Sequence, residues 1–149
     1  MKHLLLTTIA AVVLVGCGES RPPEPPTAKA PRISIWKAAS IGNVAAIKQH
    51  IAAGTDVNGT SLGATPLHFA ATYRVGNQTA LQDKQIVELL IAAGADLNAK
   101  DRGGRTPLEQ AEKGFENLLP EDQAAMKEIA DIIRKHGGKT GEELKAEGK

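Results

Sequence analysis

Residues 63–71 of the chain read Gly-Ala-Thr-Pro-Leu-His-Phe-Ala-Ala, and this stretch decides the fold. Its Thr-Pro-Leu motif at 65–67 returns forty-one residues later at 106–108. A second motif behaves in the same way, because Gly-Thr-Asp-Val-Asn at 54–58 returns forty residues later as Gly-Ala-Asp-Leu-Asn at 94–98. Self-similarity at a period of roughly 20–50 residues is the signature of a repeat architecture. The sequence therefore predicts similar units stacked one after another.

The repeated residues have the chemistry of helix starts. Thr65 and Thr106 are of a type that caps a helix N-terminus, and the proline after each suits the first helical position, where no backbone donor is needed. An alanine pair follows at 70–71, and another stands at 38–39 in an earlier unit. Small side chains allow close approach of neighbouring helices. A short first helix is therefore predicted in each unit.

The second helix of each unit shows apolar residues at helical spacing. The predicted core faces are Val44, Ile47 and Ile51 in the first unit; Ile86, Leu89, Leu90 and Ala93 in the second; and Met126, Ile129, Ala130 and Ile133 in the third. The predicted left-handed helix ends are Gly54, Gly94 and Gly137. These patterns predict an all-α fold in which every second helix buries one face.

Residues 63–71 and 86–98 resemble the ankyrin repeat family almost position for position. The resemblance covers residues 33–136 and implies an all-α solenoid of three helix-turn-helix units with β-turn connections, the smallest number expected to stack stably. The first unit has Trp36 where the family has histidine, and the third has Glu109 and Glu112 in place of histidine and alanine. Terminal units need an outer face that tolerates water, so we interpret these departures as caps.

The amino-terminal segment predicts the compartment. Lys2 and His3 precede an apolar run at 4–15, which is shorter than the roughly 20 residues a spanning helix needs and has the layout of a secretory signal. The following Gly16 and Cys17 resemble the lipobox of bacterial lipoproteins, which implies that Cys17 is acylated and becomes the new amino terminus. The alternative is a soluble exported protein with an ordinary cysteine. Gly18 implies an outer-membrane anchor facing the periplasm.

The predicted organisation has four parts. They are a signal peptide at 1–16, the lipidated cysteine and a Pro-rich linker at 17–32, the repeat domain at 33–138 with units 33–58, 59–98 and 99–138, and a polar tail at 139–149. The linker is expected to be an extended spacer of about 40 Å. The tail has almost no apolar content and is expected to be frayed.

Composition and residue spacing exclude several functions. Once Lys2 is removed with the signal, seventeen Lys and Arg face seventeen Asp and Glu, which argues against electrostatic binding of nucleic acid. One cysteine excludes an internal disulfide. No histidine pair has the spacing of a local metal motif, and the family resemblance implies that His68 bridges neighbouring units. No catalytic nucleophile stands out. We therefore predict no enzyme, no metal and no cofactor.

Two inserts lengthen the helix connections, at 72–83 and 113–119. Loops on a rigid scaffold are common sites of function, and the first insert offers Tyr73 and Arg74, types enriched in binding hot spots. The alternative is a tolerated surface excursion, because lengthening a loop costs little.

The resemblance implies a non-enzymatic protein-binding module, displayed by its lipid anchor to another, unidentified protein; we expect a monomer. The resemblance implies that partners contact the turn tips and the ends of the first helices, and the first insert adds Arg74. The candidate binding residues are therefore Ser40, Ser61, Leu62, Ala64, Thr72, Tyr73, Arg74, Arg102, Arg105 and Lys113. Arg102 and Arg105 favour an acidic partner, or else are solvated turn residues. The alternative function is a structural tether or an inhibitor of an envelope protein.

Overall fold

A computed structural model describes residues 29–72, 80–113 and 118–148. Over these ranges the regular elements are helices, without a strand. They are α1 (Ile35–Ser40), α2 (Val44–Ala52), α3 (Pro66–Ala70), α4 (Ala80–Ala92), α5 (Pro107–Glu112), α6 (Pro120–Lys135) and α7 (Gly141–Ala146). The prediction of an all-α fold is confirmed.

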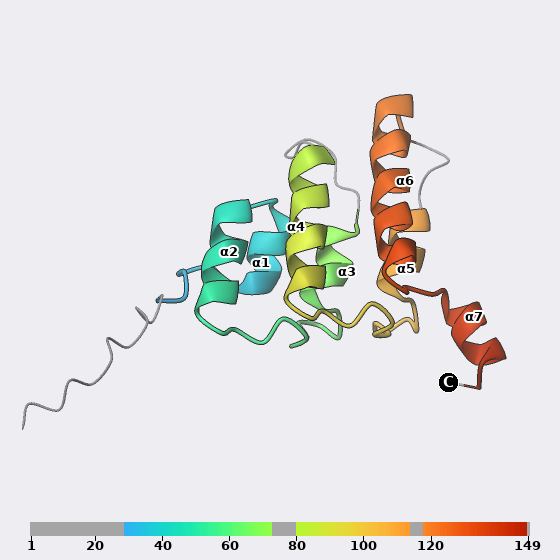
Figure 1. Cartoon of the computed structure of the whole chain (residues 1–149), viewed down its shortest axis with the longest axis horizontal. Coiled ribbons are helices and arrows are strands. Elements are labelled where there is room, and N and C mark those ends of the chain that lie inside the picture. Colours follow the sequence, from blue (N-terminus) through green and yellow to red (C-terminus); the bar gives the residue numbers. More distant parts are fainter. Residues whose placement is uncertain (1–28, 73–79, 114–117, 149) are drawn as a thin grey trace, which may run out of the picture.

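The first six helices form three stacked pairs (Figure 1). The outer helices α2, α4 and α6 stand side by side, and the shorter inner helices α1, α3 and α5 form a second layer behind them. Along the stack the outer helices lengthen from 9 to 13 to 16 residues. The loops between units lie along one edge, at the bottom of Figure 1, which we call the turn edge (residues 53–65, 93–106 and 136–140).

The inner helices begin as the sequence predicts, with a different cap in the first unit. Thr106 Oγ1 accepts from the Glu109 amide at 3.4 Å, and Glu109 Oε2 accepts from the Thr106 amide at 2.8 Å. At the second unit the Thr65 amide donates to His68 Nδ1 at 3.2 Å. In the first unit Ser34 caps α1 and accepts from the Lys37 amide at 3.3 Å. The first inner helix is therefore capped by a serine, where the other two units have a threonine.

The three outer helices end in the same way. Gly54, Gly94 and Gly137 have φ of +70°, +87° and +98°, so all three lie in the left-handed region, as predicted. At α4, the amide of Gly94 donates to the carbonyl of Ile91 at 3.0 Å, and the next amide, of Ala95, donates to Leu90 at 2.9 Å. These paired bonds satisfy carbonyls that the helix itself leaves free. The same pair occurs after α2 and α6.

The core follows the predicted outer-helix faces, with one addition. Ile86 and Leu90 are completely buried, whereas Leu89 is only half-buried at the margin of the core. Val87, which the predicted set omits, is completely buried. The reason is that α4 stands between α2 and α6 and also packs against α3. The apolar stripe of a sandwiched helix is therefore wider than that of a helix with one neighbour.

The predicted frayed tail is wrong for residues up to Gly148, because α7 forms there. Thr140 Oγ1 accepts from the Glu143 amide at 3.2 Å, and Glu143 Oε2 accepts from the Thr140 amide at 2.7 Å. The hydrogen bond from the Thr140 backbone, followed by that from its side chain, lowers the pKa of Glu143. Leu144 is buried. The capping box Thr-x-x-Glu was a helix signal that the tail's high charge obscured.

The inserts are shorter than predicted where the structure describes them. Residues 80–83, assigned by sequence to the first connection, are the first turn of α4, because Ala, Leu and Gln are good helix formers. Residues 73–79 and 114–117 lie outside the described residues, as do the signal segment and Cys17. Among the described helices, none is both long and apolar enough to cross a membrane.

Candidate protein-binding site

Two asparagines hold the turn edge together. Asn58 Nδ2 donates to the carbonyl of Gly94 at 3.1 Å, and its Oδ1 accepts from the Asp96 amide at 2.7 Å. Asn98 repeats this clamp one unit later, with the Gly137 carbonyl at 3.3 Å and the Lys139 amide at 2.8 Å. Each loop is therefore fastened to the next, which gives the edge a fixed geometry and positions α7 at its end.

The bridging role predicted for His68 is confirmed. Its Nδ1 accepts from the Thr65 amide, so Nδ1 carries no proton and the neutral ring is protonated at Nε2. Nε2 donates to the carbonyl of Arg105 in the next unit at 3.0 Å. In the first unit Trp36 makes the corresponding bridge, since its Nε1 donates to the Gly59 carbonyl at 2.9 Å. Both residues fasten one inner helix to the turn of the following unit.

The turn of the second unit contains the backbone outlier among the described residues. The amides and carbonyls of Ser61 and Ala64 bond to each other at 2.9 and 3.0 Å, which leaves a two-residue turn. Leu62 and Gly63 occupy it with φ of +54° and +82°, as a type I′ turn requires. Glycine adopts this conformation without strain, but for a leucine it costs roughly 1–2 kcal/mol. Leu62 is also 77% exposed, so neither backbone preference nor burial explains its presence.

Arg102, from the turn of the third unit, lies against this same turn. A Cβ added to Gly63 would stand 2.3 Å from Arg102 Cγ and 3.0 Å from its Nε. Gly63 is therefore needed twice, for its positive φ and for the space that the arginine stem fills. The contact brings an exposed leucine and an exposed arginine together. We call this pair of residues, Leu62 and Arg102, the turn-edge tip.

Asp101 organises the turn of the third unit and forms an ion pair with Arg105. Its Oδ1 accepts from the amides of Gly103 and Arg105 at 2.7 and 2.9 Å, and its Oδ2 lies 3.0 Å from Arg105 Nη2. Burial raises the pKa of Asp101, but hydrogen bonds from the backbone and side chain of Arg105 and from Gly103 outweigh it, so the pKa is lowered. The charge of Arg105 is thus balanced within its own turn, which leaves Arg102 as the better-placed arginine for a partner.

The other candidate residues are placed as follows. Ser40 Oγ donates to the Lys37 carbonyl at the end of α1, and Thr72 Oγ1 donates to the His68 carbonyl at the end of α3. Ser61 and Ala64 form the base of the second turn, and Lys113 is exposed at the end of α5. Tyr73 and Arg74 lie outside the described residues. The structure therefore joins Ser61, Leu62, Ala64 and Arg102 in one place.

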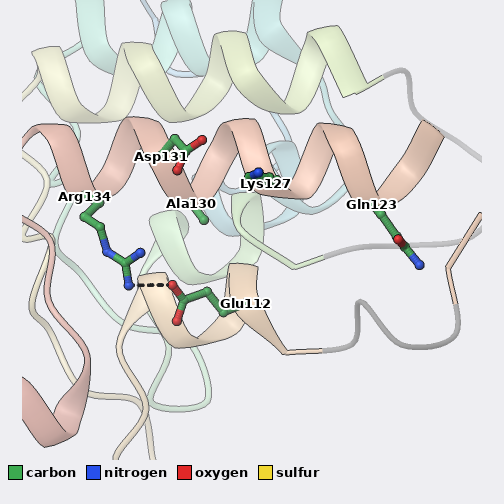
Figure 2. A pocket seen from close by; sticks show the side chains of 6 residues that line it. All are labelled: Glu112, Gln123, Lys127, Ala130, Asp131 and Arg134. Carbon is green, nitrogen blue, oxygen red and sulfur yellow. Dashed lines mark hydrogen bonds and ion pairs between the residues drawn. The ribbon is translucent and has the colours of Figure 1, made fainter. Parts of the chain in front are cut away.

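A groove of about 390 Å³ lies at the far end of the stack, on the side of α6 away from α4. It is lined by Gln123, Lys127, Ala130, Asp131 and Arg134 of α6 and by Glu112 of α5. Figure 2 shows Arg134 reaching toward Glu112, with Nη2 at 2.7 Å from Oε1. Over the described ranges no three His, Cys, Asp or Glu side chains gather to hold a metal ion.

Known proteins share this repeat pattern. A family profile for ankyrin repeats, in three copies, matches residues 35–121. That span is more than half of the chain, and the chain belongs to the ankyrin-repeat family. Ankyrin repeats indicate a module for protein–protein interaction.

Three curated relatives show how the repeats occur elsewhere. The chain is 32% identical over 81 residues to ankyrin repeat-containing protein P1E11.10 of Schizosaccharomyces pombe, covering 54% of this chain and 35% of that protein. It is 40% identical over 77 residues to the ARF GTPase-activating protein Git of Drosophila melanogaster, covering 50% and 9%. It is 34% identical over 92 residues to human Rabankyrin-5, covering 58% and 8%. The chain thus spans about a third or less of each relative.

Proposed function

We propose that this ankyrin-repeat protein is a display module of the bacterial cell envelope, anchored by an acylated Cys17, that binds another protein through its turn edge. The contact centres on the turn-edge tip. The partner contributes an apolar pocket for Leu62 and a carboxylate for Arg102. Binding requires no chemistry, because the stack supplies a rigid surface.

The observation that carries the binding site is Leu62. A residue in a strained conformation, with its apolar side chain in water, persists where a function depends on it. Arg102 adds a cation at the same place, and its stem is ordered by Gly63 before any partner arrives. Preorganised side chains lose less entropy on binding, so such a pair contributes more affinity than two mobile ones.

The lipid anchor rests on sequence alone. The apolar run at 4–15 and the small residue before Cys17 have the order of a lipoprotein signal. Bacterial lipoproteins carry more than one acyl chain, which stable anchoring requires. The Pro-rich linker would then hold the stack about 40 Å from the lipid surface, within reach of envelope proteins.

Site-specific photo-crosslinking in intact cells tests the binding site. A photoreactive residue at position 62 is expected to give one dominant adduct. The same photoreactive residue in place of Glu88, which is exposed on α4, is not expected to crosslink to that protein. Arg102→Ala should reduce the adduct at position 62. Equal adducts at 62 and 88, or none at 62, would refute binding through the turn edge. An adduct with an abundant envelope component would favour the tether, and one with a soluble enzyme would favour inhibition.

Membrane fractionation tests the anchor separately. Cys17→Ser should move the protein from the membrane to the soluble fraction and abolish incorporation of labelled palmitate, whereas Ser20→Ala should change neither. Membrane retention of the Cys17→Ser protein would remove the anchor from the proposal and leave the binding site untouched.

A further inference from the structure

The two asparagines that clamp the turn edge are equivalent in structure but not in sequence. Both accept from a backbone amide and donate to a backbone carbonyl in the next unit. Asn58 is followed by Gly59, however, and Asn98 is followed by Ala99. The difference concerns the residue whose amide nitrogen can attack the asparagine side chain.

We propose that Asn58 is a site of spontaneous deamidation, and that the modification loosens the joint between the first and second units. The deprotonated amide nitrogen of Gly59 forms a bond to Cγ of Asn58, the bond from Cγ to Nδ2 breaks, and ammonia leaves with the proton. Water then opens the cyclic imide to aspartate, or to isoaspartate when the ring opens on its main-chain side. Glycine offers an unhindered nitrogen, and alanine shields it with a methyl group.

The fold controls when this reaction can take place. Both ends of the Asn58 side chain are held, at 3.1 Å from the Gly94 carbonyl and 2.7 Å from the Asp96 amide. Ring closure needs the side chain to turn back toward its own main chain, which requires that both bonds break. Local openings of this kind occur in native proteins without global unfolding. The rate of deamidation at Asn58 in the native protein therefore depends on how often the joint between the first and second units opens.

Both products disturb that joint. Aspartate lacks the amide donor and places a carboxylate oxygen near the Gly94 carbonyl oxygen, so attraction becomes repulsion. Isoaspartate lengthens the main chain immediately before Gly59, whose carbonyl accepts the Trp36 bridge at 2.9 Å. Trp36 is the single tryptophan of the chain, so its fluorescence reports on this joint.

Peptide mass spectrometry of the full chain, aged at mildly alkaline pH, tests the proposal. In urea, Asn58 is expected to convert several-fold faster than Asn98. In the native protein, conversion at Asn58 should slow about tenfold if opening of the joint costs about 1.4 kcal/mol. Aged native protein should melt at a lower temperature and show altered Trp36 fluorescence.

Reciprocal variants supply the controls. Gly59→Ala should slow conversion at Asn58 to the rate of Asn98, and Ala99→Gly should accelerate conversion at Asn98. The first variant is expected to fold, because a Cβ at Gly59 would meet its nearest atoms at 3.4 Å and the residue has no positive φ. Asn58→Asp provides one product in pure form and should melt below the unmodified chain.

Equal rates at Asn58 and Asn98 in urea would overturn the assignment of the site. Equal rates at Asn58 in urea and in the native protein would overturn control by the fold. An Asn58→Asp protein that melts with the unmodified chain, together with an aged protein of unchanged fluorescence, would overturn the loosening of the joint.

Discussion

The second and third units share one sequence pattern but differ in the outer face that they present to the next position of the stack, most clearly where Ile91 of α4 is matched by Arg134 of α6. Counted back from the glycines that end α4 and α6, Lys84, Val87 and Ile91 correspond to Lys127, Ala130 and Arg134. Lys84 Nζ lies 3.2 Å from Glu128 Oε2 of α6, so this face of α4 is the one that α6 covers. The equivalent face of α6 lines the open groove of Figure 2.

The difference between the covered face of α4 and the uncovered face of α6 shows how the last outer helix of a short solenoid tolerates water. An inner position needs apolar residues such as Val87, whereas a face left to water carries charges that remain hydrated. Arg134 forms an ion pair with Glu112 of its own unit, with Nη2 at 2.7 Å from Oε1. The departure Glu112, which the sequence suggested as part of a cap, therefore acts together with Arg134 on the open face.

The inner helices differ in the same direction. His68 donates to the carbonyl of Arg105 in the next unit, whereas the side chain at position 109 acts as an acceptor. Glu109 instead caps its own helix. At this position the second unit hydrogen-bonds to the unit that follows it, whereas the third unit hydrogen-bonds within its own helix.

The largest expected effect comes from exchanging the chemistry of the two outer faces. Val87→Lys would bury an unpaired charge between α4 and α6 and should destabilise the stack by about 3–5 kcal/mol. Asp131→Lys places the same side chain at an exposed position of the open groove, where its ammonium reaches water, and should change the free energy of unfolding by less than about 1 kcal/mol. Urea denaturation followed by circular dichroism measures both. Similar losses in the two variants would erase the distinction between the units.

A smaller effect is expected where the bridge between inner helices is removed. His68→Ala leaves the Arg105 carbonyl and the Thr65 amide without their partner and should cost about 2–3 kcal/mol. Glu109→Ala removes one cap and should cost about 1 kcal/mol. Thermal melting can rank them. If Glu109→Ala lowered the melting temperature as much as His68→Ala, the side chain at position 109 would do more than cap its own helix.

The smallest effect concerns Asp101, which organises the third turn and has no carboxylate counterpart in the second. Because the folded-state pKa is lowered, the carboxylate stabilises the fold above its unfolded pKa of about 3.9, and this contribution is lost as the pH falls through the folded value. Asp101→Asn should therefore cost up to about 1 kcal/mol at neutral pH and progressively less below pH about 4. Stability curves at several pH values provide the measurement. A difference that grows toward acid pH would reverse the assigned sign.

Much of this architecture could be predicted because repeats place the same signal in several positions. The Thr-Pro starts, the glycine ends and the role of His68 follow from local chemistry that each unit repeats. Val87 was missed because α4 packs against several helices, and periodicity within one helix does not reveal how many neighbours it has. The helix α7 was missed because a count of charged residues outweighed the Thr140 capping box.

The candidate site was only partly predictable. Family position selected Leu62 and Arg102 separately, but the approach of Arg102 to the turn that contains Leu62 depends on the absence of a side chain at Gly63. The internal pairing of Arg105 with Asp101 likewise depends on turn geometry, which residue types alone do not fix.

The most direct test of the account measures stability and binding together in Leu62→Gly. Glycine accepts the left-handed conformation that strains leucine, so the variant should unfold at the same free energy or up to about 1 kcal/mol higher. It should at the same time lose most of its affinity for the protein crosslinked at position 62. A variant that keeps full affinity for that partner would show that the turn edge is not where this protein binds.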